Sequence, residues 1–251
     1  MQNITEILAQ KKWPPHNYSS AYVRGFDHWF LPDNINRIDK TLKKINEKAE
    51  VKKCLDIGFG NPIVLQRELR IFPQCNGLYV TLRIAFEKGI NKSILYEGNC
   101  YQIPFDPNEF DLVSAYALLH IIPDISEFYK EAYRVLKKGG CLYTDGDRNI
   151  FLIKIMRKFK MIQYRLTGNK NKFEYWSKIF ITKENFHQEG IDYVQLKIKL
   201  LQIGFSNVVI TPWFSANPNL DKNIVYHFLK NLLVFFKFNF FSTHIQILAI
   251  K

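Results

Sequence analysis

The sequence of 251 residues is poor in cysteine and has no long uninterrupted apolar run. Its four cysteines stand far apart and form no CxxC pair, which argues against zinc ribbons and disulfide frameworks and fits a reducing compartment. No metal site is expected. The first residues lack the basic and then apolar pattern of a signal peptide. The longest apolar stretch, residues 224–241, is interrupted by histidine, lysine and asparagine, so it is not expected to span a membrane. We therefore expect a cytoplasmic protein.

Acidic residues are scarce in the second part of the chain. Residues 151–251 hold 15 Lys and Arg against 5 Asp and Glu, a net charge of +10. Residues 1–150 hold 20 against 18, a net charge of +2. Such an excess of positive charge serves solubility, or it attracts an acidic substrate, a nucleic acid or a membrane surface. Composition alone leaves these interpretations open.

Internal repeats and low-complexity linkers are also absent, and from Val51 onward short apolar segments alternate with helical ones. This alternation predicts βαβ units, and hence a parallel sheet with helices on both faces. The last two strands are expected to form an edge hairpin joined by a short hydrophobic connection. The expected strands are KKCLDIG, NGLYVTL, SILYEGN, FDLVSAYALLH, CLYTDGD, NVVITPWF and THIQILAIK.

The helices are predicted from apolar spacing and from their stop signals. Apolar residues recur three and four apart between Ile35 and Ile45, which suits a helix with one buried face. A helix that begins near residue 124 is expected to stop at Gly139 and Gly140, and a later one is expected to end at Gly204.

Five ordered blocks with consistent spacing carry a family resemblance. They are LDIGFG, GLYV, EGNCYQIPF, FDLVSAYALLHIIPD and EAYRVLKKGGCLYTDGD, within about residues 50–147. Together they resemble the class I S-adenosylmethionine-dependent methyltransferases, in the type 11-like branch whose substrates are often small molecules. The resemblance implies an enzyme that uses S-adenosyl-L-methionine to methylate an oxygen, nitrogen or carbon atom of a small molecule.

The resemblance also implies the fold and its divisions. We expect an α/β, Rossmann-like, doubly wound and mostly parallel seven-stranded sheet with an antiparallel last strand. The chain is then a single methyltransferase domain over residues 1–251. Its parts are an N-terminal helical lid (1–50), a cofactor-binding core (51–147), a helical cap inserted after strand five (148–190), and C-terminal helices with the edge hairpin (191–251).

The first block is expected to hold the methionine end of the cofactor. Asp56 ends the first strand, and Gly58 and Gly60 allow the backbone to turn tightly against a ligand. Pro62 stands where a third glycine is usual in the family. Proline is favoured in the first turn of a helix, so we expect Pro62 to open the next helix.

Two further positions depart from the family pattern. The second strand normally ends in an acid that binds both ribose hydroxyls, and Tyr79 stands there with a single oxygen. Asn99 replaces the aspartate that meets the adenine amino group, and its amide oxygen can accept the same bond. We expect these changes to weaken cofactor binding by about one or two decades without abolishing it. The resemblance also places Cys100 and Ala115 beside the cofactor.

Methyl transfer needs an aligned acceptor and, for an O–H or N–H group, a general base. His120, just after the fourth strand, is the best candidate base. Asp145 and Asp147 lie on the same edge and are interpreted as turn or cap residues. Arg24, with Tyr18 and Tyr22 in the aromatic N-terminal segment, is expected to contact the cofactor carboxylate or the substrate. His187 in the cap is interpreted as a surface histidine.

Alternative functions remain open at this point. The basic C-terminal part suggests RNA or another polyanion as the acceptor, although the chain has no RNA-binding module and no amino-methylating block in SAYALLH. The altered positions Tyr79, Asn99 and Pro62 suggest a degenerate, non-catalytic binding protein. Segment 148–165 and region 224–241 suggest peripheral contact with a membrane and a lipid acceptor. The sequence indicates no oligomeric state.

Overall fold

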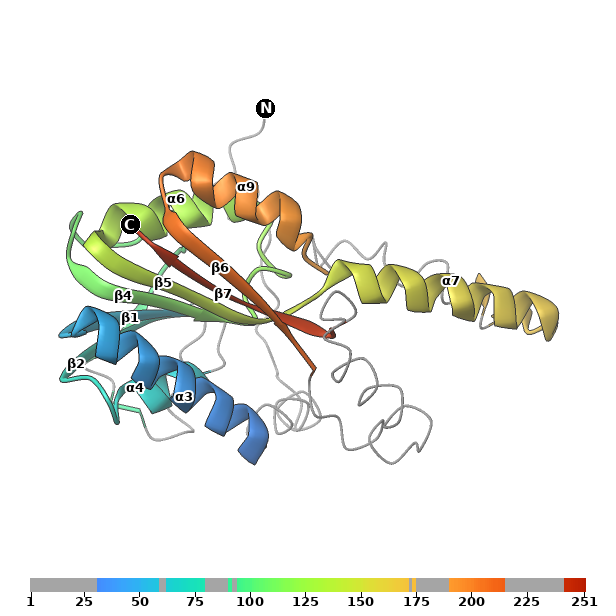
Figure 1. Cartoon of the computed structure of the whole chain (residues 1–251), viewed down its shortest axis with the longest axis horizontal. Coiled ribbons are helices and arrows are strands. Elements are labelled where there is room, and N and C mark those ends of the chain that lie inside the picture. Colours follow the sequence, from blue (N-terminus) through green and yellow to red (C-terminus); the bar gives the residue numbers. More distant parts are fainter. Residues whose placement is uncertain are drawn as a thin grey trace.

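A seven-stranded sheet in the order β3-β2-β1-β4-β5-β7-β6 forms the centre of the molecule (Figure 1). The structure is a computed structural model that describes residues 31–58, 62–79, 90–91, 94–171, 173–174, 190–214 and 242–251. The strands are β1 (Lys53–Gly58), β2 (Gln74–Tyr79), β3 (Leu95–Glu97), β4 (Phe110–Tyr116), β5 (Leu136–Arg148), β6 (Ser206–Trp213) and β7 (His244–Ile250).

The first five strands pair in parallel, and β7 lies antiparallel between β5 and β6. The Rossmann-like sheet with an antiparallel last strand is therefore confirmed. The β6–β7 pair stands at one side of the sheet with β6 as its edge strand. The expectation of a short connection between these two strands is wrong, because residues 214–243 separate them.

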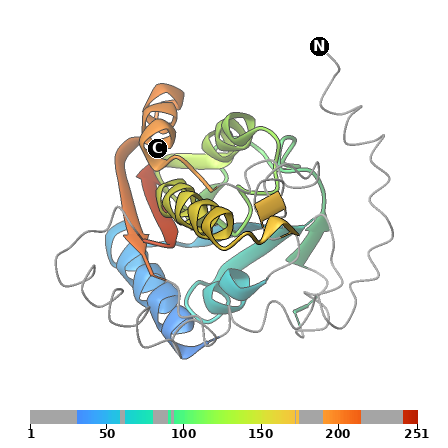
Figure 2. The ribbon, with the colours of Figure 1, turned by 90° about the vertical axis from the view of Figure 1, so that its right-hand side faces the viewer.

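Helices cover both faces of the sheet. α3 and α4 lie on one face, and α6 and α9 lie on the other (Figure 2). α7, the remaining helix of the described residues, extends away from the sheet beyond the end of β5 (Figure 1). Their bounds are α3 (Pro32–Ala49), α4 (Ile63–Glu68), α6 (Ile125–Val135), α7 (Ile150–Leu166) and α9 (Tyr193–Ile203).

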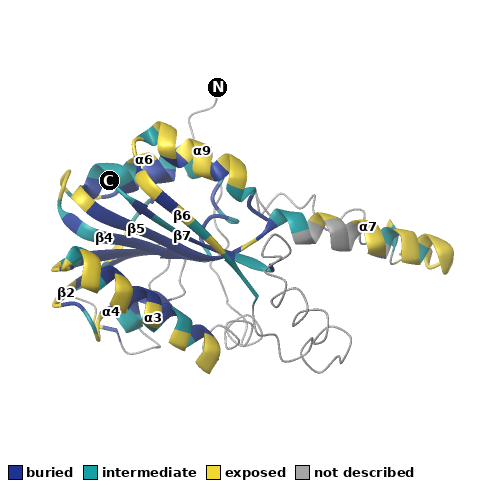
Figure 3. Cartoon of the chain, in the orientation of Figure 1, coloured by how far each residue is buried: buried dark blue, intermediate teal, exposed yellow. Residues whose placement is uncertain are grey.

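Two apolar layers result from the alternation of side chains along the strands. On one face, Leu55 and Ile57 of β1 pack with Phe128 of α6 and Leu200 of α9. On the other, Cys54 packs in the same layer as residues of α3 and α4. The central strands are almost entirely buried, and exposure is concentrated on the outer faces of the helices (Figure 3).

The helix boundaries agree with the sequence signals with one exception. Pro62 is the N-cap of α4, and Gly204 ends α9 in the left-handed conformation, as expected. α6, however, ends at Val135, ahead of Gly139 and Gly140. Its next residue, Leu136, is extended and pairs with Phe110 of β4, so the strand begins there.

The expected lid and cap are only partly within the described residues. The lid prediction covered residues 1–50, but α3 inside that range is a structural helix whose Ile38, Leu42 and Ile45 are buried in the core. The remainder of the lid prediction, residues 1–30, lies outside the described residues. The expected cap contains α7, and most of the segment after α7, residues 175–189, also lies outside them.

Candidate functional site

The strand order creates a switch point between β1 and β4. The chain adds β2 and β3 on one side of β1 and then returns to place β4 on the other side. Helical connections diverge at such a point, and ligands of open α/β sheets bind outside the carboxyl ends of the strands there. Gly58 ends β1 and Tyr116 ends β4, with Ile57 and Ala115 paired just before them. The candidate site therefore lies at this edge.

Asp56 lies just under this edge as a buried carboxylate. Only 1% of the residue is exposed, and it accepts a hydrogen bond of 2.9 Å from the Ser114 hydroxyl on β4. Glu68 of α4 is also buried nearby, where the Cys54 thiol donates to its Oε2. Burial raises the pKa of the Glu68 carboxyl well above its usual range, and the charge of Asp56 adds to this effect. The fold thus buries Asp56 near the carboxyl end of β1 and favours the protonated form of Glu68.

The ends of β2 and β3 bring two more predicted residues to the same edge. Tyr79 is the last residue of β2, opposite Gly58 of β1 and Glu97 of β3. Asn99 follows β3, and its Oδ1 accepts the Tyr101 backbone N–H at 2.9 Å. A carbonyl oxygen has two lone pairs, so this turn leaves one of them for a ligand.

Of the remaining residues predicted to contact the cofactor, the structure describes Cys100 and Ala115. Burial raises the pKa of the Cys100 thiol to about 12, so its thiolate is not available at neutral pH. Ala115 is buried inside β4 and faces the α6 side of the core. Both lie near the edge, and neither offers a reactive side chain there. Three other predicted residues, Arg24, Gly60 and His187, lie outside the described residues, as do Tyr18 and Tyr22.

A β-bulge at Gly146 separates the two acids at the end of the fifth strand. Asp145 pairs with Gln246 of β7, but Asp147 pairs with the next residue, Ile245, so β5 carries one extra residue. Gly146 supports the bulge with a φ of +82°, a conformation that favours glycine. As a result, the two acids have different surroundings. They are strand residues and not the turn or cap residues that we expected, since the N-cap of α7 is Asn149.

Asp147 holds the candidate base. Its Oδ1 accepts the His120 backbone N–H at 3.1 Å and lies 2.9 Å from the ring nitrogen Nδ1. The carboxylate is 2% exposed, whereas the imidazole is 33% exposed. When Nδ1 donates its proton to Asp147, Nε2 carries the lone pair that a general base needs. The pair lies at the carboxyl ends of β4 and β5, next to the switch point. Sequence reasoning found His120 but missed its partner.

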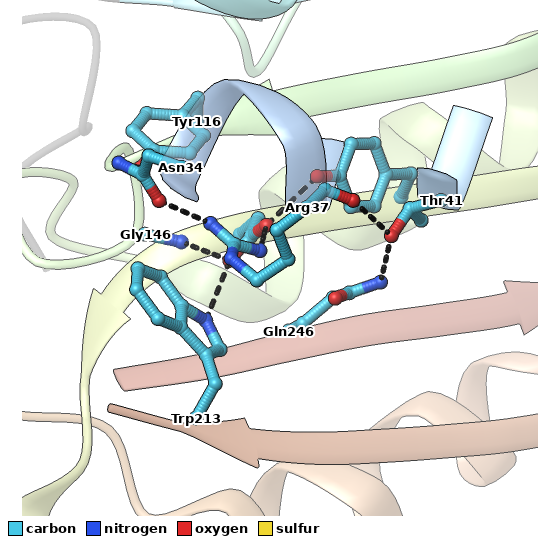
Figure 4. A network of polar contacts seen from close by, with 9 residues as sticks. Asn34, Arg37, Thr41, Tyr116, Gly146, Trp213 and Gln246 are labelled. Atoms are coloured by element: carbon cyan, nitrogen blue, oxygen red, sulfur yellow. Dashed lines mark hydrogen bonds and ion pairs between the residues drawn. The ribbon is translucent and has the colours of Figure 1, made fainter. Parts of the chain in front are cut away.

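Asp145 is the centre of a buried network on the opposite face. Figure 4 shows this network around its partners Arg37, Gly146 and Trp213. Asp145 accepts hydrogen bonds from the Arg37 guanidinium, the Tyr143 hydroxyl, the Gly146 N–H and the Trp213 indole. Burial raises the pKa of the Asp145 carboxyl, and the charge of Arg37 acts against that rise. Sequence reasoning did not predict this network.

Arg37 extends the network across several elements. Its second amino group donates to Asn34 at 2.8 Å, and Asn34 donates to the Tyr116 hydroxyl at 3.0 Å. The guanidinium also lies over the Trp213 ring, 3.6 Å from its centroid. The network therefore ties α3 to β4, β5 and β6 immediately behind the bulge that positions Asp147.

The described edge fits S-adenosylmethionine, the cofactor that the resemblance implies. The Asp56 carboxylate is buried near the carboxyl end of β1, Gly58 places no side chain at that end, and Asn99 has acceptor capacity after β3. The one mismatch is at the end of β2, where Tyr79 replaces the ribose-binding acid of the family.

Comparison with known proteins gives a family match over this part of the chain. A family described as "Methyltransferase domain" matches residues 55–144, which contain the strand ends that form the switch point. A demethylmenaquinone methyltransferase of Lactiplantibacillus plantarum is 28% identical over 211 residues, covering 83% of this chain and 82% of that relative. Sterol 4-C-methyltransferase strm-1 of Caenorhabditis elegans is 29% identical over 136 residues, covering 47% of this chain and 40% of that relative.

A solved structure shares the fold. Phosphoethanolamine N-methyltransferase 2 of Haemonchus contortus, in complex with S-adenosyl-L-methionine, superposes with a TM-score of 0.60 at 14% identity. The match covers 94% of this chain and 58% of that one. The family match over residues 55–144, the relatives, the sheet order and the strand-end residues agree, and together they support a class I S-adenosylmethionine-dependent methyltransferase.

Proposed function

We propose that the chain methylates a ring carbon of a small apolar phenol or quinol, with His120 as general base and Asp147 as its positioning residue. The observation that carries the proposal is the 2.9 Å contact between His120 Nδ1 and Asp147 Oδ1 at the switch-point edge. The nature of the acceptor is supported by the names of the relatives, a demethylmenaquinone methyltransferase and a sterol 4-C-methyltransferase.

The acceptor chemistry explains why a base is useful. S-adenosylmethionine, when bound, supplies an electrophilic methyl group on its sulfonium sulfur. A neutral phenol or quinol ring carbon is a weak nucleophile, and removal of the hydroxyl proton increases the electron density at the neighbouring carbon. His120 Nε2 would accept that proton. The methylated ring is then a dienone; its carbon-bound proton would pass to water while the protonated His120 returns its proton to the ring oxygen, which restores the aromatic ring.

Asp147 contributes by fixing the imidazole. Its single oxygen Oδ1 contacts both the backbone N–H and the ring of His120, so the turn and the ring orientation are set together. The negative charge also stabilises the imidazolium that forms when Nε2 accepts a proton. Because Asp147 is almost fully buried, its effect on His120 is not strongly screened by water.

Transfer of labelled methyl to a short-chain naphthoquinol tests the proposal. His120→Ala should lower kcat by about 100-fold to 10,000-fold, and it should leave the dissociation constant for S-adenosylmethionine unchanged in calorimetry. Asp147→Asn keeps the size of the side chain and should lower kcat by about tenfold to 100-fold without raising KM. The matched control is Asp192→Asn, which replaces another carboxylate at the N-cap of α9 and should change neither constant.

Three results would overturn the proposal. Wild-type kcat in His120→Ala would remove the role of His120. Measurable cofactor binding without transfer to any phenol or quinol would remove the acceptor class, and absence of binding even at about millimolar cofactor would instead favour a degenerate protein.

A further inference from the structure

The outer part of α7 is a basic and apolar surface that the proposed methyl transfer does not use. Three large apolar side chains are exposed there, Phe159 by 70%, Ile162 by 58% and Leu166 by 83%. Their spacing of three and four residues places them on one stripe of the helix. Lys154, Lys158 and Arg165 are also exposed on α7. We call these six residues the α7 surface.

The charge of this segment has a single sign. No Asp or Glu occurs between Asp147 and Glu174, and α7 itself contains five Lys or Arg. None of the three exposed cations of the α7 surface forms an ion pair with another residue that the structure describes. An exposed apolar stripe beside exposed cations is not explained by solubility, because solubility does not require the apolar residues.

The base of α7 is fixed firmly to the sheet. Asn149 is fully buried, accepts the Phe151 N–H at 3.1 Å and donates to the Ser242 hydroxyl at 3.2 Å. The Phe151 ring packs edge-on against Tyr193 at the start of α9. Beyond this base the helix projects from the body and its outer turns are exposed (Figure 3). A rigid base and an exposed outer part are what a docking helix requires.

We propose that the α7 surface docks the protein on a membrane that contains anionic lipid. Helices of this kind lie in the plane of the interface, with the apolar stripe inserted and the cations near lipid phosphates. Every helix in the described ranges is too short or too polar to cross a bilayer, so α7 would lie on the membrane and not through it.

Other occupants fit less well. Ile162 and Leu166 are aliphatic, so they offer neither a face for base stacking nor a hydrogen-bonding group to a nucleic acid. A second copy of the same surface would bring like charges together. Anionic lipid matches both the charge and the apolar stripe.

Docking through α7 would also orient the catalytic edge. α7 begins shortly after Asp147, at the carboxyl end of β5, and projects from that side of the sheet (Figures 1 and 2). The candidate base would therefore lie close to the membrane interface, next to the bilayer in which apolar quinols dissolve. Only this consequence rests on the proposed function, and the docking itself requires no substrate.

Flotation of the full chain with vesicles, without cofactor or acceptor, tests the docking. The wild type should float with phosphatidylcholine vesicles that contain phosphatidylglycerol. With vesicles of pure phosphatidylcholine it should stay in the bottom fraction of the gradient. Each cation near an anionic surface contributes about fivefold to binding, so Lys154→Gln with Lys158→Gln should reduce partitioning about 25-fold. Phe159→Ser with Leu166→Ser should reduce it by about tenfold or more.

A matched control exists on α9. Ile198 and Leu201 are exposed by 45% and 50%, respectively, and Ile198→Ser with Leu201→Ser should float as the wild type does. Insertion can be measured directly because all four native cysteines are buried, so Leu166→Cys offers a selective site for an environment-sensitive dye. Its emission should shift to the blue with anionic vesicles, whereas the same dye at Leu201→Cys should not respond.

The docking proposal fails if the wild type does not float with anionic vesicles, or if Phe159→Ser with Leu166→Ser floats equally well. Retention of transfer RNA with a steep salt dependence, without vesicle binding, would replace lipid by nucleic acid as the partner. Loss of methyl transfer with intact flotation would count against the proposed function alone.

Discussion

Removal of the Arg37 charge should destabilise the protein in a way that depends on pH. Arg37→Met keeps the aliphatic stem but leaves the Asp145 carboxylate, whose side chain is 0% exposed, without its cation. Removing one partner of a buried ion pair costs about 3 to 5 kcal/mol. Three neutral donors to Asp145 remain, from Tyr143, Gly146 and Trp213. We therefore expect the free energy of unfolding to fall by about 3 kcal/mol at neutral pH, near the lower end of that range.

The sign of the pH dependence is set by Asp145. Burial already raises the pKa of this carboxyl, and loss of Arg37 should raise it further. An acid with a raised pKa in the folded state retains its contribution to stability below its unfolded pKa of about 3.9, and it loses that contribution as the pH rises through the folded-state value. The deficit of Arg37→Met relative to the wild type should therefore be small in acid and grow towards neutral pH.

Urea unfolding followed by circular dichroism measures this deficit. Adding Asp145→Asn to Arg37→Met removes the uncompensated charge, so the double variant should be at least about 1 kcal/mol more stable than the sum of the single effects. The control is Lys130→Met, which breaks an exposed pair with Glu127 and should leave the urea midpoint unchanged. A loss below about 1 kcal/mol in Arg37→Met, or strict additivity in the double variant, would refute the reasoning.

Three further perturbations have defined outcomes. Gly146→Ala places a Cβ 2.8 Å from the Tyr116 ring at a φ of +82°, so it should cost about 1 to 3 kcal/mol in urea unfolding and lower kcat about tenfold by disturbing Asp147. Glu68→Gln should remove a decline in wild-type stability of about 1.4 kcal/mol per pH unit above about pH 5, because the buried Glu68 carboxyl has a raised pKa. Unfolding curves at several pH values check this slope. Tyr79→Asp restores the two ribose acceptors of the family and should lower the calorimetric dissociation constant for S-adenosylmethionine about tenfold.

The sheet and its cofactor edge were predictable because their signals are local. Apolar strands ending at Asp56 and Asn99 are visible within a few residues, and parallel strands must present those ends at one edge. The end of α6 was not predictable in the same way. Gly139 and Gly140 are good stop signals, but Leu136 already pairs with Phe110 of β4, and this long-range pairing ends the helix earlier.

The polar network around Asp145 could not be predicted either, because it also depends on contacts between residues far apart in the sequence. Arg37 and Asp145 are 108 residues apart, and nothing near either residue indicates the other. An arginine on an amphipathic helix is ordinarily solvent-exposed, and here the fold places it over Trp213 instead. Only the assembled sheet brings α3, β5 and β6 together.

The sequence TDGD contains a local signal that explains the division of labour between its two acids. Two residues apart on a regular strand, Asp145 and Asp147 would point to the same face. Glycine inside a strand often marks a bulge, and the bulge at Gly146 breaks that alternation. Asp145 is consequently directed to Arg37 and stabilises the fold, whereas Asp147 is directed to His120 and orients the candidate base. One extra residue in β5 thus gives two neighbouring carboxylates separate roles, and the buried network behind the bulge keeps them apart.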